Sequence, residues 1–250
     1  MDTESVIPEQ LWDFEDPSSS LERFRALRAA ATGDSPADSV LATQEARALG
    51  LLEQYAEAHG VLDGLDPSLS PEVATRIHLE RGRLLRSAGH DPAHAATEFE
   101  AAASAAGVAG LEALHVDALH MLALMVESPA DQAAANRRAL DVALASQEQR
   151  ARDWDASLLN NLGCALVDDA QLEEALETFR QALTARIRIG SAREIQIARW
   201  MVGWTLRLLG RTDEARTVQH GLRLELDAAG IEDEYVDEEL ALLGPADEPS

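Results

Sequence analysis

The sequence predicts an all-α protein, a right-handed α-solenoid of about five helical hairpins with a capping helix at each end. Three observations support this fold class. A block of small and apolar residues recurs about every forty positions, clusters of β-branched and aromatic side chains are scarce, and turn signals separate segments of helical length. Repeated hairpins bury a continuous core by stacking on one another. We therefore expect one array over residues 37–230, between an extension over 1–36 and a capping helix with a tail over 231–250.

The N-terminal extension carries the signals of a capping helix over residues 11–31. Asp16 can accept hydrogen bonds from the first turn, and Pro17 lacks the amide that would be unpaired there. Trp12 and Phe14 precede this pair. We expect both rings to fold back on the first hairpin.

Helix starts in the first half of the chain are marked by an N-cap residue followed by proline, and glycines mark turns in the second half. Between Ala130 and Gly244 there is no proline, so the later helices are expected to be uninterrupted. Three glycines spaced by twenty residues indicate helix ends or turns: Gly190, Gly210 and Gly230. The five N-cap pairs are Asp16-Pro17, Ser35-Pro36, Ser70-Pro71, Asp91-Pro92 and Ser128-Pro129.

The repeated block places a small residue where the two helices of a hairpin cross. Its clearest copy is Leu159-x2-Leu162-Gly163-x2-Leu166, followed by Ala175-x3-Phe179. Two others are His78-x2-Arg81-Gly82-x2-Leu85 with Ala95-x3-Phe99, and Leu119-x2-Leu122-Ala123-x2-Val126 with Ala135. The first copy is degenerate. The crossing residues are Ala46, Gly82, Ala123, Gly163 and Gly203, separated by 36, 41, 40 and 40 positions.

This block resembles the tetratricopeptide repeat (TPR) superfamily, and the opening Trp12-Asp13-Phe14-x-Asp16-Pro17 is similar to a group of bacterial repeat proteins of unassigned function. The resemblance implies a scaffold whose first helices line a concave groove that binds peptides or proteins. The usual repeat has about 34 residues, so a repeat of about forty lengthens each helix by nearly one turn.

Residues 231–243 are expected to form the final amphipathic helix, with four side chains directed inward. A tail follows from Pro245. The four inward side chains are Tyr235, Val236, Leu240 and Leu243.

The charge of the chain restricts its partners. Forty-five acidic residues against 21 basic ones give a formal net charge of −24, and all 21 basic residues are arginine. Such a field repels phosphate backbones and anionic lipid, so we expect neither nucleic acid nor membrane as a partner. Two explanations for the missing lysine stay open: codon bias in a GC-rich genome and adaptation to high internal salt.

Signals of catalysis, metal binding and export are weak or missing in the sequence. Cys164 is the only cysteine, and no secretory signal or membrane-length apolar run is present, so we expect a cytoplasmic protein. No phosphate loop, G-x-S-x-G or H-E-x-x-H motif occurs. His90-x3-His94 has the spacing of a metal pair on a helix, but Pro92 interrupts it and no third ligand is near. We expect no enzyme activity, metal or cofactor.

The resemblance implies where a groove site would lie. Positions six, three and two before each crossing residue, and one and four after it, are expected to face the groove. The candidate groove residues chosen from these positions are Arg76, Arg83, Arg86, Asp117, His120, Asn160, Asn161, Trp200, Met201, Trp204 and Arg207.

Each group of candidates has a structural alternative. The three arginines are suited to an acidic ligand, or they pair internally with Glu80 or Asp117. The asparagines are suited to a peptide backbone, or they bond neighbouring helices. The tryptophans are suited to a binding anchor, or the terminal helix covers them together with Tyr235. His120 beside Asp117 is expected to be structural rather than a general base.

Two functions follow from this interpretation. The first is a non-catalytic adaptor whose groove binds a segment of an unidentified cytoplasmic protein or peptide, with self-association possible. The second is a sensor in which a small ligand or signalling peptide changes the curvature of the solenoid. Such sensors usually carry an effector such as a DNA-binding helix-turn-helix, and residues 1–36 look too short and acidic for one.

Overall fold

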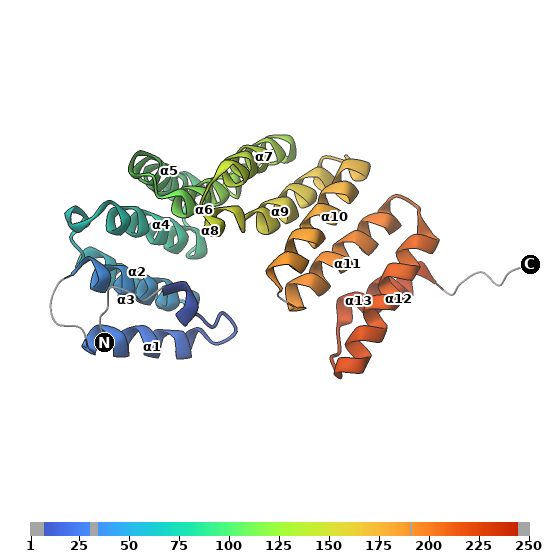
Figure 1. Cartoon of the computed structure of the whole chain (residues 1–250), viewed down its shortest axis with the longest axis horizontal. Coiled ribbons are helices and arrows are strands. Elements are labelled where there is room, and N and C mark those ends of the chain that lie inside the picture. The colour runs from blue at the N-terminus through green and yellow to red at the C-terminus, as the bar shows by residue number, and fades with distance from the viewer. Residues whose placement is uncertain (1–7, 31–34, 191, 245–250) are drawn as a thin grey trace, which may run out of the picture. The chain divides into compact units, whose positions relative to one another are not determined.

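The computed structural model describes residues 8–30, 35–190 and 192–244, and this part of the chain consists of α-helices, short 3-10 turns and loops, without a strand (Figure 1). The prediction of an all-α fold is confirmed. None of the described helices is long and apolar enough to cross a membrane. The chain divides between Met125 and Val126 into two compact units.

The described residues of unit 1 form six α-helices that pack pairwise along the chain, and α2 also packs against α4. Phe24 and Phe99 are fully buried in it. Its elements are η2 (Pro8–Leu11), α1 (Pro17–Ala30), α2 (Pro36–Leu51), α3 (Tyr55–Asp63), η3 (Pro67–Leu69), α4 (Pro71–Ser87), α5 (Pro92–Ala109) and α6 (Glu112–Ala123).

Unit 2 begins with α7, which packs against α9, and each later helix then packs against the next one along the chain. Its largest hydrophobic cluster is built around Phe179. Its elements are α7 (Pro129–Ala145), α8 (Gln149–Arg152), α9 (Asp155–Asp168), α10 (Leu172–Ile189), α11 (Ala192–Leu208), α12 (Thr212–Ala229) and α13 (Glu234–Leu243).

The predicted helix starts and turns are confirmed. Helices α1, α2, α4, α5 and α7 begin at the five predicted prolines. The side chain before each proline accepts a first-turn amide, as when Ser70 Oγ accepts the amide of Val73 at 3.1 Å. The three predicted glycine turns adopt the left-handed backbone, with φ of 90° at Gly190, 73° at Gly210 and 69° at Gly230.

Two of the crossing residues, Gly82 and Gly163, lie where the two helices of a hairpin meet. A Cβ atom added to Gly163 would stand 2.5 Å from Phe179, and one added to Gly82 would stand 2.5 Å from Phe99. No side chain fits in that space. Helices α10 to α12 have 17 or 18 residues each, as the lengthened hairpin predicts. The prediction is wrong for α3, α6 and α9, which have 9, 12 and 14 residues.

The third copy of the repeat differs from the prediction. Its first helix, α6, ends at Ala123, so the expected helical residues up to Val126 lie outside it. Pro129 follows the crossing residue by six positions, whereas in the fourth copy Leu172 follows Gly163 by nine. Ser128 must be extended because it precedes proline and caps α7, and this shortens the preceding helix.

The N-terminal cap is confirmed in its packing and wrong in its extent. Trp12 donates from Nε1 to Oε1 of Gln44 at 2.8 Å, and its ring stacks on Phe14 at 4.8 Å between centroids. The helix itself begins only at Pro17, because Asp16 caps it there. The last predicted residue, Ala31, lies outside the described residues.

The C-terminal helix is confirmed, except for one side chain. Val236 and Leu243 are buried, and Leu240 packs against the cluster that contains Val236. Tyr235 is 62% exposed, so its predicted inward position is wrong. The amides of Tyr235 and Val236 both bond to the Asp233 carboxylate at the start of α13, and it is the adjacent Val236 that points into the core.

Candidate functional site

Helices α2, α4 and α6 are the first helices of the repeats in unit 1, and we call the side of each unit formed by such helices the first-helix face. On α4, Arg83 donates to Oε1 of Glu80 and to Oδ1 of Asp117 on α6, each at 2.5 Å. The Arg83 side chain is only 15% exposed. This is the internal pairing that the sequence left open as an alternative.

Burial and charge act in opposite directions in this ion cluster. Burial lowers the pKa of Arg83, but the attraction of Asp117 and Glu80 outweighs it, and the pKa of Arg83 is raised. Burial likewise raises the pKa of Asp117, whereas Arg83 and Arg47 lower it by more, and the net shift is downward. Both partners are therefore charged at neutral pH.

The remaining candidates of unit 1 lie in different surroundings. Arg76 is buried, and its Nε lies 2.8 Å from Oε1 of Glu72. Arg86 is exposed and has no ion pair within the described part of the chain. His120 is half-buried, and burial is the main cause of its lowered pKa, so its ring is neutral at pH 7.

One arginine of the first-helix face was missed by the sequence analysis. Arg47 on α2 lies over the rings of Trp12 and Phe14, with its Cζ 5.5 and 5.4 Å from their centroids. It makes no hydrogen bond or ion pair with any described residue. Arg47 follows the crossing residue Ala46 by one position, as Arg83 follows Gly82. The same offset would have found it, had the degenerate first copy been searched.

In unit 2 the first-helix face has an amide beside an apolar strip. Asn160, Asn161 and Cys164 are half-buried on α9, and Asn160 forms no hydrogen bond among the described residues. Cys164 packs on the main cluster of unit 2 together with Met201 and Trp204 of α11. Burial raises the pKa of the Cys164 thiol to about 11, so it is protonated at neutral pH.

Two further candidates of unit 2 hold the C-terminal helix. Trp200 donates from Nε1 to the carbonyl of Tyr235 at 3.0 Å and stacks on Trp204 at 5.8 Å. Arg207 makes two hydrogen bonds of 2.7 Å to the carboxylate of Glu239, which is buried. Both side chains are therefore engaged by α13, which is the alternative proposed for the tryptophans.

No family model and no curated protein matches the sequence. Among solved structures, the chain is similar to BtubC (BKLC) from P. vanneervenii, with 17% identity over 98% of each chain and a TM-score of 0.64. It is also similar to PlcR from Bacillus thuringiensis, solved with the peptide PapR7 and DNA, with 13% identity over 92% of this chain and 100% of that one and a TM-score of 0.54. The chain has the fold of the tetratricopeptide-type repeat proteins.

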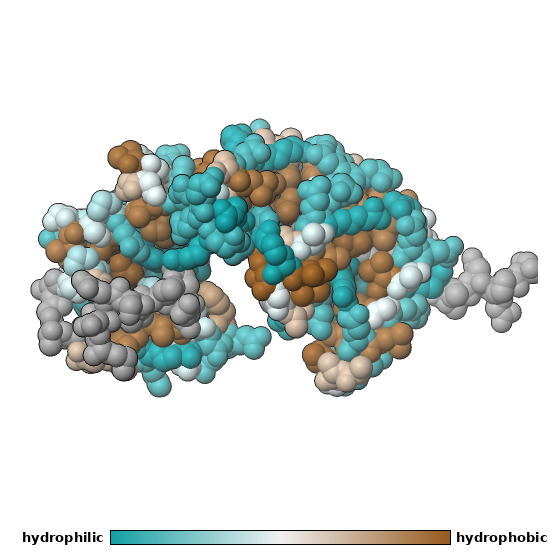
Figure 2. All heavy atoms as spheres, viewed as in Figure 1, coloured by the Kyte–Doolittle hydropathy of each residue, from teal (hydrophilic) through white to brown (hydrophobic). Residues whose placement is uncertain are grey.

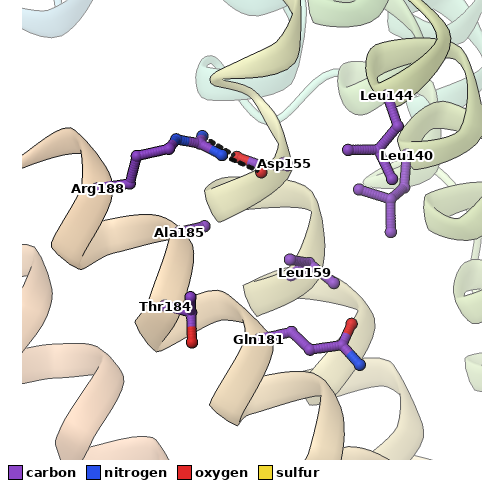
Figure 3. Close-up of a pocket in the computed structure, with 8 residues that line it drawn as sticks. All are labelled: Leu140, Leu144, Asp155, Leu159, Gln181, Thr184, Ala185 and Arg188. Carbon is purple, nitrogen blue, oxygen red and sulfur yellow. Dashed lines mark hydrogen bonds and ion pairs between the residues drawn. The ribbon is translucent and has the colours of Figure 1, made fainter.

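Three helices of unit 2 in this tetratricopeptide-type fold line a pocket that the sequence did not predict. It measures about 320 Å³ and lies between α7, α9 and α10. Leu140 and Leu144 lie on one side of it and Arg188, paired with Asp155 at 2.8 Å, on the other (Figure 3). Leu159 also lines this pocket, and forty positions later the chain carries Arg199. Arg199 lines a second pocket of about 290 Å³ together with Val202, Val218 and Leu222, so a pocket does recur in the next repeat.

Apolar surface also gathers over the end of α10 and the start of α11 (Figure 2). Ile187, Ile189 and Ile197 on these helices are between 40% and 55% exposed.

The residues described in this tetratricopeptide-type fold form no group of three His, Cys, Asp or Glu side chains placed to hold a metal ion. His90 and His94 are both exposed, and the helix begins between them at Pro92.

Proposed function

We propose that this protein is a non-catalytic repeat scaffold that binds a peptide segment of a partner protein along its first-helix face. The observation that carries this proposal is Asn160, a half-buried amide that has no hydrogen bond among the described residues. An amide can donate and accept at once, and a peptide backbone offers both matching groups at every residue. The partner is an unidentified cytoplasmic protein or peptide.

The surroundings of Asn160 fit an extended peptide. Cys164 lies one helical turn after it and shares an apolar cluster with Met201 and Trp204 on α11. A peptide whose backbone pairs with Asn160 and Asn161 can place an apolar side chain on this strip. Aromatic and methionine side chains are typical of such contacts.

In unit 1 the first-helix face offers charge instead of apolar surface. Arg86 is exposed and can reach a ligand, whereas Arg76 and Arg83 are held by Glu72 and by the Glu80–Asp117 pair. We assign the held arginines and His120 a structural role on this face of unit 1. Trp200 and Arg207 have the corresponding structural role in unit 2, because both donate hydrogen bonds to α13.

The thiol of Cys164 and the pair of His120 with Asp117 are not poised for catalysis. The only thiol is protonated at neutral pH, and the carboxylate beside His120 is engaged by Arg83. A general base needs a free carboxylate or an exposed imidazole near its substrate. These observations support a binding function rather than an enzyme.

The proposal is tested by selecting ligands for the wild-type chain from a display library of random short peptides. Replacing Asn160 with Ala is expected to weaken the binding of the selected peptides about tenfold, because the contacts to their backbone are lost. This corresponds to about 1.4 kcal/mol of binding free energy. The melting temperature should stay unchanged, since Asn160 makes no internal hydrogen bond.

A matched control is Gln181→Ala, which removes an exposed amide from α10 on the opposite side of the hairpin. This variant should bind the selected peptides as tightly as the wild type does. Equal binding by Asn160→Ala and the wild type would place the peptides elsewhere and refute the proposal.

A second candidate is a sensor whose solenoid changes curvature when a small ligand or signalling peptide binds. The likeness to PlcR favours it, since that protein was solved with a peptide and DNA. Small-angle scattering with and without a saturating selected peptide separates the two functions. A ligand-dependent change in the radius of gyration supports the sensor, and an unchanged radius with saturated binding supports the scaffold.

A further inference from the structure

Two pockets of unit 2 lie on opposite flanks of α10. The first lies between α7, α9 and α10, and Leu144 and Gln181 are among the residues that line it (Figure 3). The second lies between α10, α11 and α12, and its lining includes Leu183 and Leu222. A helix with its side chains is about 10 Å wide, so the two pockets stand about that far apart.

The surface between the pockets is more basic than the chain as a whole. Residues 178–199 contain five arginines against one acidic residue, Glu194, whereas the whole chain has a net charge of −24. Successive residues are turned by about 100° around a helix, and this places Arg180 between Gln181 of the first pocket and Leu183 of the second. Arg180 is exposed on the outer side of α10.

The charge of Arg180 is available to a partner. No hydrogen bond or ion pair joins its side chain to a described residue. The carboxylate of Glu214 nearby accepts two hydrogen bonds from Arg211, which are the main cause of its lowered pKa, and Arg180 adds a smaller effect. A carboxylate that approaches α10 between the pockets can therefore pair with Arg180.

The exposed side of α13 carries the complementary pattern. Tyr235 is 62% exposed and Leu242 is 66% exposed, and they are seven positions apart. Seven residues make two helical turns, a rise of about 10.5 Å, so both side chains lie on the same side of the helix. Glu238 is exposed between them and makes no ion pair with a described residue. The spacing matches the distance between the two pockets.

This side of α13 cannot reach the pockets of its own chain. Helix α13 packs against α11 and α12, and the side chains it buries there include Val236 and Leu243. Tyr235 and Leu242 therefore face away from the unit to which they belong. Only another molecule can cover them.

We propose that α13 of one copy of this chain docks across α10 of a second copy, with Tyr235 and Leu242 in the two pockets and Glu238 against Arg180. A second copy is the occupant that the chain itself supplies, since α13 has the required spacing, two apolar side chains and a carboxylate between them. The contact uses α7, α10 and α12, and it is therefore separate from the peptide binding proposed for the first-helix face.

The association is expected to be weak and to grow with concentration. A helix of ten residues covers less than the roughly 1,200 Å² that stable interfaces bury. Because the two surfaces differ, each contact leaves a free pair of pockets on one copy and a free α13 on the other. Larger assemblies should follow the first pair of copies as the protein concentration rises.

The test measures the mass of the wild-type protein by sedimentation over about a hundredfold range of concentration, in about 150 mM salt to screen repulsion between copies. Gly221→Leu fills the second pocket, since a Cβ atom added to Gly221 has nothing within 4 Å. This variant and Leu242→Ala should each weaken association at least about tenfold. Val108→Ala, at a position on α5 that is 90% exposed, is the control and should associate as the wild type does.

A charge reversal tests the register of the contact. Arg180→Glu and Glu238→Arg should each weaken association, and the double variant should recover it because the pair is restored with its signs exchanged. Arg81→Glu combined with Glu238→Arg has the same net charge as the wild type but should not recover association. Arg81 pairs with Asp63 and lies on α4 in unit 1, outside the proposed contact.

Melting temperatures show that each variant is folded before its mass is compared. A wild type that stays monomeric over the whole range would overturn the inference, as would undiminished association of Gly221→Leu or failure of the double reversal to recover it. Association lost in Asn160→Ala and kept in Gly221→Leu would place the contact on the first-helix face instead. Peptide binding by Gly221→Leu should equal that of the wild type, so the two proposals can fail separately.

Discussion

Gly163 shows how a single residue decides the spacing of two helices. Its Cα lies against the buried ring of Phe179, and a Cβ atom there would approach Cε1 within 2.5 Å. Replacing Gly163 with Ala is therefore expected to destabilise the protein by about 1–3 kcal/mol, because the ring or a helix must move. Urea denaturation of the two proteins measures the difference.

Gly221 is the matched control for this prediction. It lies inside α12, and a Cβ atom added to it would have nothing within 4 Å, so Gly221→Ala should stabilise the helix by about 0.5–1 kcal/mol. Adding Phe179→Leu to Gly163→Ala should recover part of the loss through the freed space. Equal effects of the two glycine substitutions would contradict the close approach.

Arg83 is expected to control how stability depends on pH. In the folded wild type the pKa of Asp117 is lowered. The charged Asp117 carboxylate therefore contributes its full stabilisation above the unfolded pKa of about 4, and this stabilisation is lost as pH falls through the folded pKa. In Arg83→Gln, burial without this partner raises the pKa of Asp117. The variant should lose about 3 kcal/mol at neutral pH.

The sign of the pH effect is the decisive observation. Between about pH 7 and about pH 5, Arg83→Gln should become more stable as the buried Asp117 carboxylate takes up a proton, while the wild type gains no stability from Asp117 over this range. Denaturation in urea at both pH values compares the two proteins. A parallel pH dependence would show that Asp117 does not depend on Arg83.

At the scale of the helix, the sequence predicted those features that neighbouring residues decide. An N-cap followed by proline acts within one turn, and all five such pairs begin a helix. The crossing glycines also needed only local spacing. The early end of α6 depends instead on the distance to the next helix start, and α8 has no cap signal in its sequence.

Helix α13 completes the core of unit 2, and its stabilising residues can be tested. Val236 is 1% exposed, and Trp200 bonds to the adjacent carbonyl. Val236→Ala should cost about 2 kcal/mol, and it should shift Trp200 fluorescence to longer wavelength as water reaches the indole. Leu242→Ala, at a position 66% exposed, should change stability by less than about 0.5 kcal/mol.

At the scale of the molecule, the sequence located the candidate residues on the first helices of the repeats, but not which of their polar groups have partners. Arg83 and Arg47 stand at equivalent positions of two repeats, yet one is saturated by carboxylates and the other rests on aromatic rings. The difference arises from Asp117, 34 positions after Arg83, and from Trp12, 35 positions before Arg47. Contacts at such separations depend on the packed fold and cannot be read from spacing.

The net charge of −24 gives the last prediction, which concerns the whole chain. Exposed ion pairs such as Arg211–Glu214 contribute little and are weakened by salt. Repulsion among the excess carboxylates is also screened, and it extends over the whole surface. Raising sodium chloride from about 10 mM to about 150 mM shortens the screening length from about 30 to about 8 Å. The melting temperature should therefore rise by a few degrees, which corresponds to a gain of about 1 kcal/mol in the free energy of unfolding.

Salt beyond this range separates the two explanations for a chain without lysine. If the composition reflects codon bias, stability should level off once the surface charges are screened, near about 0.5 M salt. If it reflects adaptation to high internal salt, stability should continue to rise into the molar range. Sucrose at matched osmolality is the control, because it favours the compact state without screening charge. A melting temperature that falls on the first addition of salt would mean that the exposed ion pairs outweigh the repulsion, and that the acidic excess does not oppose folding.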